Sequence, residues 1–413
     1  MEWSRQYSSV VWLDSNGHSD KYSSAEALMA VYRQTDMSEN SYNTIDEVQD
    51  FIDKKKDWLF GFISYDFKNT LEKLESKNPD TIGFPELHFS CPEKIIRFDQ
   101  QMVEFHYLIP FENEIEKDFT IIQNLMPRQS KPSKGIRIQM RMYKEAYFKK
   151  VNQILDHIRL GNIYEVNFCQ EFYSNHSTID PWSTYKHLNA ISQPPFASFV
   201  KYGDAYLMGA SPERYLKKIG GQVISQPIKG TSRRDDIPEK DELLKRQLAN
   251  DMKERSENIM ITDLVRNDLS RSASRGSVAV TELCKVYTFK QVHQMISTVT
   301  SEVSPSIEPT QLIKDTFPMG SMTGAPKISA MNIIEEMEAS KRGLYSGTVG
   351  YFEPNGNFDF NVVIRSILYN AARKYVSYSV GSAITARSIP EKEYEECLLK
   401  AKAMRSVLEA KNS

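Results

Sequence analysis

The sequence predicts an α+β fold in which large antiparallel sheets form the core. Strand-like runs come in consecutive pairs, whereas a parallel sheet would require regular alternation of strands and helices. Apolar residues make up 40% of the 413 residues and aromatic residues 11%, which is enough to fill a substantial core. The length fits one large domain or two ordinary ones.

Short runs of strand-forming residues, each bounded by turn-forming residues, predict the strands. In the first third of the chain, such runs cover residues 9–13, 58–65 and 101–108. Residues 205–209, 362–364 and 375–380 have the same character further along. We expect these segments to be strands of mixed or antiparallel sheets.

Apolar residues at helical spacing predict the helices. Between residues 143 and 160, Val151, Ile154 and Ile158 recur on one side, and Gly161 follows as a C-terminal cap. Further helices are expected over residues 240–267, from residue 326 to before residue 343, and from residue 390 to the end of the chain.

A polar segment divides the chain. Residues 127–135 are basic and rich in Pro and Ser, a composition typical of a linker. We therefore expect an N-terminal region of residues 1–126, a linker of residues 127–142 and a second domain of residues 143–410.

Charge and cysteine content exclude several classes of protein. The 52 Lys and Arg nearly balance the 54 Asp and Glu, so no global field favours nucleic acid or an acidic membrane. The four cysteines are far apart and lack the close pairs of zinc and redox motifs. The N-terminus lacks a basic stretch followed by an apolar one, and no apolar run is long enough to span a membrane. We expect a cytoplasmic protein with a small-molecule partner.

Two acidic pairs are candidates for a metal site. Glu254 and Glu257, and likewise Glu393 and Glu396, are three residues apart and so share one side of a helix. A solvated acidic face is the simpler interpretation. However, Glu257 shares its stripe with apolar residues, as does Glu396, and carboxylates on a half-buried face need a cation. Without His or Cys partners, they suit a hard ion such as Mg²⁺.

Three further features carry possible chemistry. Residues 317–327 join glycines and hydroxyls to a proline that opens a helix, which suits either an anion site or a plain helix entry. Lys229 lies in a β-type run and is either an edge residue or, if desolvation lowers its pKa, a nucleophile or base. Glu213 is either catalytic or part of a surface turn.

Together these segments resemble the chorismate-utilising enzymes, the family of the anthranilate, aminodeoxychorismate, isochorismate and salicylate synthases. The resemblance is close over residues 143–407 and weaker before them. Its motifs occur in the family's order: Ser-Pro-Glu-Arg at 211–214, Pro-Ile-x-Gly-Thr at 227–231, the acidic motif at 254–268, Thr-Gly-Ala-Pro-Lys at 323–327 and Glu-Tyr-x-Glu at 393–396. The resemblance implies a β-sandwich core flanked by helices, with a chorismate-binding catalytic domain after the linker.

The resemblance also implies roles for individual residues. Glu257 and Glu396 would bind Mg²⁺ directly, with Glu254 and Glu393 acting through water. Glu213 would be the general acid that helps the C4 hydroxyl of chorismate to leave, because hydroxide is a poor leaving group unless protonated. The carboxylates of chorismate would lie near Gly230, Thr231, Ser321, Tyr345, Arg365, Lys400 and the turn Gly381-Ser382-Ala383.

Lys229 discriminates within the family. It resembles the lysine of the aminodeoxychorismate branch, where anthranilate synthases carry alanine. By that resemblance, Lys229 would attack C2 and expel the C4 hydroxyl, after which ammonia would enter at C4. The product would be 4-amino-4-deoxychorismate, a precursor of p-aminobenzoate and folate.

Some positions depart from the family pattern. Glu165 occupies the slot of a glutamine in most aminating members and of a water-activating lysine in the isochorismate and salicylate enzymes. Gln294 replaces the histidine of anthranilate synthases, and neighbouring His293 does not take over that role. Ser382 and Ala383 replace smaller or more flexible residues, which alters the rim of the pocket.

Two alternatives remain at this stage. The chain could be anthranilate synthase component I, which Lys229 opposes, or a catalytically silent paralogue that binds chorismate or tryptophan. The chain lacks a glutaminase signature, so we expect ammonia to come from solution or from a separate glutamine amidotransferase subunit. Leu13-Asp14-Ser15 lies where the family places a tryptophan pocket.

Overall fold

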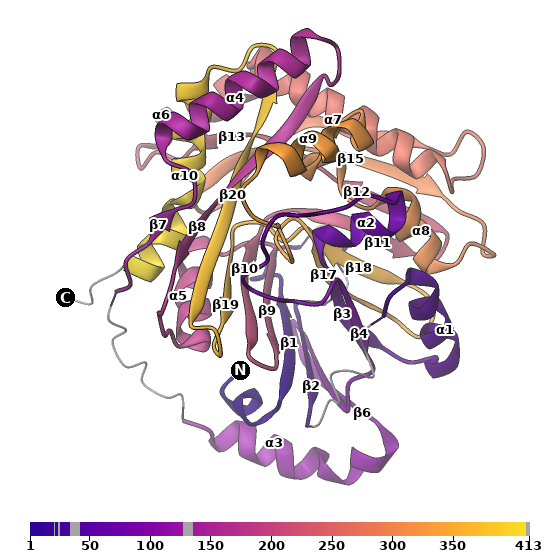
Figure 1. The fold of residues 1–413 in the computed structure, drawn as a ribbon. Helices are drawn as coiled ribbons and strands as arrows, with labels where there is room; N and C mark the ends of the chain where they lie inside the picture. The colour runs from indigo at the N-terminus through magenta and orange to yellow at the C-terminus, as the bar shows by residue number, and fades with distance from the viewer. Residues whose placement is uncertain (20, 24, 34–41, 127–134, 410–413) are drawn as a thin grey trace.

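Two large sheets face each other, and helices cover their outer sides (Figure 1). The computed structural model describes residues 1–19, 21–23, 25–33, 42–126 and 135–409. Within these residues, one sheet has 11 strands and the other has 9. All their pairings are antiparallel, so the predicted class of α+β with large antiparallel sheets is confirmed.

The first sheet joins strands from both ends of the chain. Its order is β16-β8-β20-β19-β10-β9-β1-β2-β5-β6, and β7 pairs with β8. The strands are β1 (Ser9–Asp14), β2 (Ala27–Tyr32), β5 (Lys94–Asp99), β6 (Met102–Tyr107), β7 (Gln139–Met140), β8 (Glu165–Ser174), β9 (Phe196–Tyr202), β10 (Ala205–Ser211), β16 (Gly324–Ala325), β19 (Ser366–Asn370) and β20 (Tyr375–Thr385).

The second sheet has the order β13-β15-β12-β11-β18-β17-β3-β4, and β14 pairs with β15. Its strands are β3 (Leu59–Ile63), β4 (Leu87–Ser90), β11 (Arg214–Ile219), β12 (Gln222–Gln226), β13 (Ile228–Arg233), β14 (Ala279–Thr288), β15 (Val292–Glu302), β17 (Thr348–Phe352) and β18 (Phe358–Asn361).

The helices fall into two groups by the sheet they cover. Those on the outer face of the first sheet are α4 (Lys144–Arg159), α5 (Pro181–Ser192), α9 (Lys327–Met337) and α10 (Pro390–Glu409). Those near the second sheet are α1 (Ile45–Lys55), α6 (Pro238–Asn250), α7 (Met252–Ser270) and α8 (Pro309–Thr316). The remaining helices are α2 (Lys68–Glu72), α3 (Ile115–Asn124) and the short 3₁₀ turns η1 (Glu2–Gln6), η2 (Tyr65–Phe67), η3 (Ile109–Glu114) and η4 (Gly320–Met322).

The core has two main parts. One lies between the sheets and continues under α1, α7 and α8; it includes Val11, Phe62 and Ile261. The other fills the space between the first sheet and its four helices. Burial of these apolar side chains is the main force holding the layers together.

Most predicted elements are present, and two are wrong. The predicted helix over residues 240–267 is two helices, because Asp251 caps α7: its Oδ1 accepts hydrogen bonds from the backbone N–H groups of Lys253 (2.8 Å) and Glu254 (3.0 Å). The predicted strand at residues 362–364 is an irregular link between β18 and β19, and its backbone bonds to loops at Glu213 and Gly347. A β-type composition alone does not distinguish such a buried link from a strand.

Both sheets cross the boundary expected at residues 127–142. Strand β1 pairs with β9 in the first sheet, and β3 pairs with β17 in the second. Residues 127–134 of the expected linker lie outside the described residues. No helix in the described part of the chain has the length and apolar character needed to cross a bilayer.

Candidate active site

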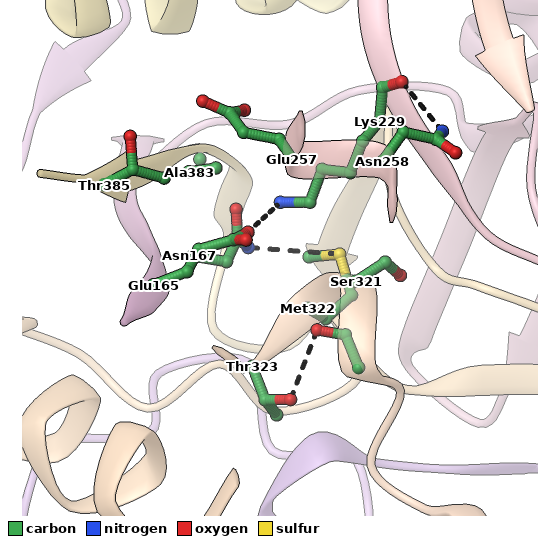
Figure 2. Close-up of polar contacts among 12 residues, drawn as sticks. Glu165, Asn167, Lys229, Glu257, Asn258, Ser321, Met322, Thr323, Ala383 and Thr385 are labelled. Carbon is green, nitrogen blue, oxygen red and sulfur yellow. Dashed lines mark hydrogen bonds and ion pairs between the residues drawn. The ribbon is translucent and has the colours of Figure 1, made fainter. Parts of the chain in front are cut away.

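Lys229 projects from β13 into the space between the sheets, toward β8 (Figure 2). Its Nζ lies 3.0 Å from Oε1 of Glu165, and its side chain is only 10% exposed. The backbone around it is held by Asn258 on α7, whose Nδ2 donates a hydrogen bond to the Lys229 carbonyl at 3.1 Å. The lysine is therefore a buried group, not an exposed residue at the edge of a sheet.

The pKa of Lys229 moves upward, not downward. Burial alone would lower the pKa of the ammonium group. The carboxylates of Glu165 and Glu257 outweigh burial, so the pKa of Lys229 lies above its usual value. The lysine is thus a buried cation at neutral pH and must lose a proton before it can act as a nucleophile.

Glu213 lies between β10 and β11 and is 3% exposed. Burial raises its pKa to about 7, although a hydrogen bond from Ser321 Oγ (2.6 Å) and the N–H of Ile228 (3.4 Å) favour the ionised form. Ser321 belongs to η4, within the glycine-rich run singled out in the sequence. A carboxylic acid that is half protonated near neutral pH is suited to general acid catalysis.

The four glutamates of the predicted metal site come from two helices. Glu254 and Glu257 lie on α7, and Glu393 and Glu396 lie on α10. Lys253 lies between the helices, with its Nζ 3.6 Å from Glu257 and 3.3 Å from Glu393.

The acid–base properties of these carboxylates show which of them lack a counter-charge. Burial raises the pKa of Glu257 to about 8 despite the positive charges of Lys229 and Lys253. Burial also opposes ionisation of Glu396, but Lys400, 2.5 Å away, outweighs it and holds the pKa of Glu396 below its usual range. A further cation would therefore stabilise the ionised form of Glu257.

The donor set fits a hard divalent cation. Oε1 of Glu257 and Oε2 of Glu393 are buried without a hydrogen-bond partner among the described residues. All four donors are carboxylates, the oxygen ligands that Mg²⁺ prefers. As they stand, however, no three His, Cys, Asp or Glu side chains in the described part of the chain are grouped closely enough to hold an ion. Lys253 would have to withdraw for the two helices to share one.

Several residues expected to bind carboxylates gather around this acidic cluster. Gly230 has φ +101°, and a Cβ there would lie 3.3 Å from Oε2 of Glu254 and 3.1 Å from Cβ of Met295. Thr231 follows it, opposite Gln294 on β15. The positive φ favours glycine at residue 230, and a larger side chain would also lie tight against Met295 and Glu254.

Two half-buried cationic side chains complete the group. Partial burial lowers the pKa of Arg365, while the nearby groups of Tyr345 and Glu396 oppose that shift. Lys400 Nζ donates a hydrogen bond to the Gly381 carbonyl at 2.9 Å. Arg365 and Lys400 therefore lie on the Glu396 side of the cluster, where they could neutralise a carboxylate.

The segment Gly381-Ser382-Ala383 is not a turn. It lies within β20, where Gly381 pairs with Cys169 and Ala383 with Asn167 of β8. The hydroxyl of Ser382 is 3.2 Å from the Tyr147 hydroxyl on α4, so this side chain faces the outer helices, away from Lys229. A Cβ at Gly381 would lie 2.5 Å from Cys169 Sγ, which explains the glycine by close packing of two strands.

Three functional neighbours were not among the predicted site residues. Lys253 could have been found from its i, i+4 spacing to Glu257. Glu165 was noted as a departure, but its contact with Lys229 depends on two distant strands. Arg342 gave no local signal: it is 6% exposed, pairs with Glu338 at 2.6 Å and donates to the Met322 carbonyl at 2.6 Å, which fixes the chain just after Ser321.

His293 takes no part in this group. Its Nε2 lies 2.9 Å from Asp241 Oδ1 on α6, and its Nδ1 lies 3.0 Å from the Thr288 hydroxyl. It fixes α6 to the second sheet instead. A separate cavity of about 440 Å³ lies beside Leu13, Asp14 and Ser15, and none of the predicted site residues lines it.

Comparison with known proteins identifies the family. The family model of the chorismate binding enzymes matches residues 8–406. The chain belongs to the chorismate binding enzyme family. The family expected from the sequence motifs is thereby confirmed, and the chain is a chorismate-utilising enzyme.

Relatives in this family carry two names. The chain is 34% identical over 360 residues to anthranilate synthase component 1 of Thermus thermophilus, covering 85% of this chain and 77% of that protein. It is 33% identical over 336 residues to aminodeoxychorismate synthase component 1 of Salmonella typhimurium, covering 81% and 73%. It is 39% identical over 274 residues to aminodeoxychorismate synthase of Streptomyces griseus, covering 66% of this chain but spanning only 37% of that longer protein.

A solved structure confirms the fold of this chorismate binding enzyme. Anthranilate synthase component I from Streptococcus pneumoniae superimposes with a TM-score of 0.77 at 26% sequence identity, covering 96% of this chain and 90% of that one. Overall similarity therefore does not separate the two branches, and the distinction depends on individual residues.

Proposed function

We propose that this enzyme aminates chorismate at C4 with ammonia and yields 4-amino-4-deoxychorismate. The observation that carries the proposal is the burial of Lys229 in the group of acidic and cationic residues, with Glu213 nearby as a carboxylic acid of pKa about 7. A nucleophile and an acid are both needed to exchange a hydroxyl for an amine, and Lys229 and Glu213 are a nucleophile and an acid of the required kinds.

The two residues would act in sequence. The nitrogen of Lys229 attacks C2 of chorismate, both ring double bonds shift, and the C4–O bond breaks. Glu213 gives its proton to the departing hydroxyl, which leaves as water. Ammonia then attacks C4, both double bonds shift back, and the bond from C2 to Lys229 breaks. The enolpyruvyl side chain stays in place throughout.

The other residues would hold the substrate. Arg365 and Lys400 would pair with its carboxylates, since a dianion needs cationic groups in a buried site. Mg²⁺ held by Glu257 and Glu396, with Glu254 and Glu393 through water, would supply a further positive charge for a substrate carboxylate.

The ammonia would come from a separate glutamine amidotransferase subunit. Two of the relatives named above are called component 1, which supports a second component. With a cognate glutaminase, glutamine should replace ammonium as the nitrogen source; failure of that pair to support turnover would contradict this part of the proposal.

A product assay tests the reaction. The purified protein, given chorismate, Mg²⁺ and ammonium, should form a product that becomes p-aminobenzoate only after a separate lyase is added. Direct appearance of fluorescent anthranilate would instead identify an anthranilate synthase, the alternative that the Thermus relative and the Streptococcus structure favour. Absence of any turnover would support the silent paralogue.

Two substitutions at Lys229 test the covalent step. Lys229→Ala removes the amine, and Lys229→Arg keeps a cation that can pair with Glu165 but is not a nucleophile. We expect both variants to lose amination by at least about 100-fold. Activity retained by Lys229→Arg alone would show that only the charge matters, and activity retained by both would remove the lysine from the chemistry.

A further inference from the structure

Glu165 is a buried carboxylate whose only cationic contact in the described structure is Lys229. It lies at the start of β8, opposite Ala325 of β16 and Thr385 of β20, and is 0% exposed. Although Oε1 is 3.0 Å from the lysine nitrogen, neither carboxylate oxygen forms a well-directed hydrogen bond within the described residues. The contact is therefore an ion pair with loose geometry (Figure 2).

The fold brings Glu165 and Lys229 together from two different sheets. Strand β8 belongs to the first sheet and β13 to the second, so Glu165 and Lys229 meet across the space between them. Both side chains are shielded from water, and solvent is therefore a poor acceptor for a proton from the lysine. A buried carboxylate with free oxygen lone pairs, at hydrogen-bond distance, is a better one.

The other carboxylates near Lys229 have other proposed roles in the site. Glu257 and Glu396 are the expected metal ligands, and Glu213 is the expected acid for the leaving hydroxyl. Glu165 is the member of this group that lies in direct ion-pair contact with the ammonium. An amide in its place could orient the lysine but could not accept a proton.

We propose that Glu165 takes a proton from Lys229 to generate the nucleophilic amine and returns it when the lysine is released. This inference depends on the proposed function. The ammonium and carboxylate become a neutral amine and a carboxylic acid; the amine lone pair then forms the bond to C2 as the C4–O bond breaks. When ammonia displaces the lysine, the C2–N electrons return to nitrogen, and the acid gives its proton back.

The test compares Glu165→Gln with a matched control on the same strand. Glu171 is also a buried carboxylate of β8 and pairs with Arg141 at 2.8 Å, remote from Lys229. For wild type, Glu165→Gln and Glu171→Gln, kcat and the KM for chorismate are measured across pH, with total ammonium adjusted to keep free ammonia constant. Each product is identified as in the assay above.

At pH 7, Glu165→Gln should lower kcat by about 100-fold or more, with little change in KM. Glu257 on α7, Glu396 on α10 and Glu213 beside β11 still face the lysine, so it should keep its proton near neutrality. The kcat of this variant divided by that of wild type should rise with pH as solvent removes that proton, because loss of the Glu213 proton affects both enzymes alike. The same ratio for Glu171→Gln should stay constant with pH.

Glu165→Asp provides a second variant that retains an acceptor. Its kcat should fall, but its dependence on pH should follow wild type. The proposal is overturned if Glu165→Gln matches wild type at pH 7, or if its loss is the same at every pH, which would indicate a purely positional role. A failure of the proposed function can be distinguished from a failure of the role of Glu165. If Lys229 is not the nucleophile, Lys229→Ala will still aminate chorismate.

Discussion

At the scale of single residues, counter-charges decide the acid–base character of the site. The pKa of the buried Glu213 rises to about 7, whereas that of the half-buried Glu396 falls. A lysine contributes to the difference: Lys400 lies 2.5 Å from Glu396, while the Glu213 carboxylate accepts hydrogen bonds from a hydroxyl and a backbone N–H within the described residues. Identical side chains thus serve as an acid and as an anion.

The pKa of Glu213 predicts how activity depends on pH. The acid form is present below about pH 7 and is lost above it. We therefore expect kcat/KM for chorismate, at constant free ammonia, to fall as pH rises through about 7. Glu213→Gln, which cannot donate a proton, should lower kcat by about 100-fold or more at pH 6.

Ser321 supplies a control on this assignment. Its hydroxyl donates to Glu213 and stabilises the ionised form, so Ser321→Ala should raise the pKa of the acid further. The descending limb of the pH profile should then move to higher pH. If the descending limb of the pH profile stays in place or moves to lower pH, a group other than Glu213 causes the loss of activity.

At the scale of elements, local patterns predicted the periodic segments well. Strands β1, β3, β6, β10 and β20 and helices α4, α9 and α10 overlap the segments expected from local sequence pattern. The long predicted helix was wrong because Asp251 caps α7 and divides it in two. The turn at residues 381–383 was implied by the resemblance, whereas the structure places these residues within β20.

The candidate site was proposed from the resemblance, and local pattern alone does not assemble it. On α10 the pattern suggested Glu396 for the apolar face, whereas Leu399 in its stripe is 54% exposed and Glu393 is the deeply buried carboxylate, at 1%. The contact between Lys229 and Glu165 joins strands of different sheets. No spacing within the chain reveals such a pair.

Because Asp251 caps the helix that carries Glu254 and Glu257, we expect the stability of α7 to affect how activity depends on the Mg²⁺ concentration. Asp251→Ala should lower the free energy of unfolding by about 0.5–2 kcal/mol and fray the first turns of α7, which hold Glu254 and Glu257. Urea unfolding measures the first effect. The second should appear as a higher Mg²⁺ concentration for half-maximal activity.

The matched control caps a different helix. Thr44 forms a capping box at α1, which contacts α8 and lies away from the glutamates. Thr44→Ala should cause a similar loss of stability with an unchanged response to Mg²⁺. An equal shift in both variants would show that the change in metal response is only a general effect of destabilisation.

At the scale of the whole molecule, the N-terminal region completes both sheets. Strands β1 and β2 connect β9 to β5 and β6, and β3 extends the second sheet beyond β17. The main core combines residues from both regions, including Phe62 on β3 and Leu207 on β10. The site depends on this arrangement, because Lys229 and Glu165 face each other only while the sheets are held together.

Shared sheets predict that the chain unfolds in one transition. Phe62 is 1% exposed on the N-terminal side of the expected boundary, so Phe62→Ala should lower the free energy of unfolding by about 3–5 kcal/mol. Far-UV circular dichroism, tryptophan fluorescence and activity should all shift to the same lower urea concentration. Phe119→Ala, at a residue 41% exposed on α3, should shift them much less. An early fluorescence change with activity retained would show that residues 1–126 unfold separately, and the two regions would then be independent despite their common strands.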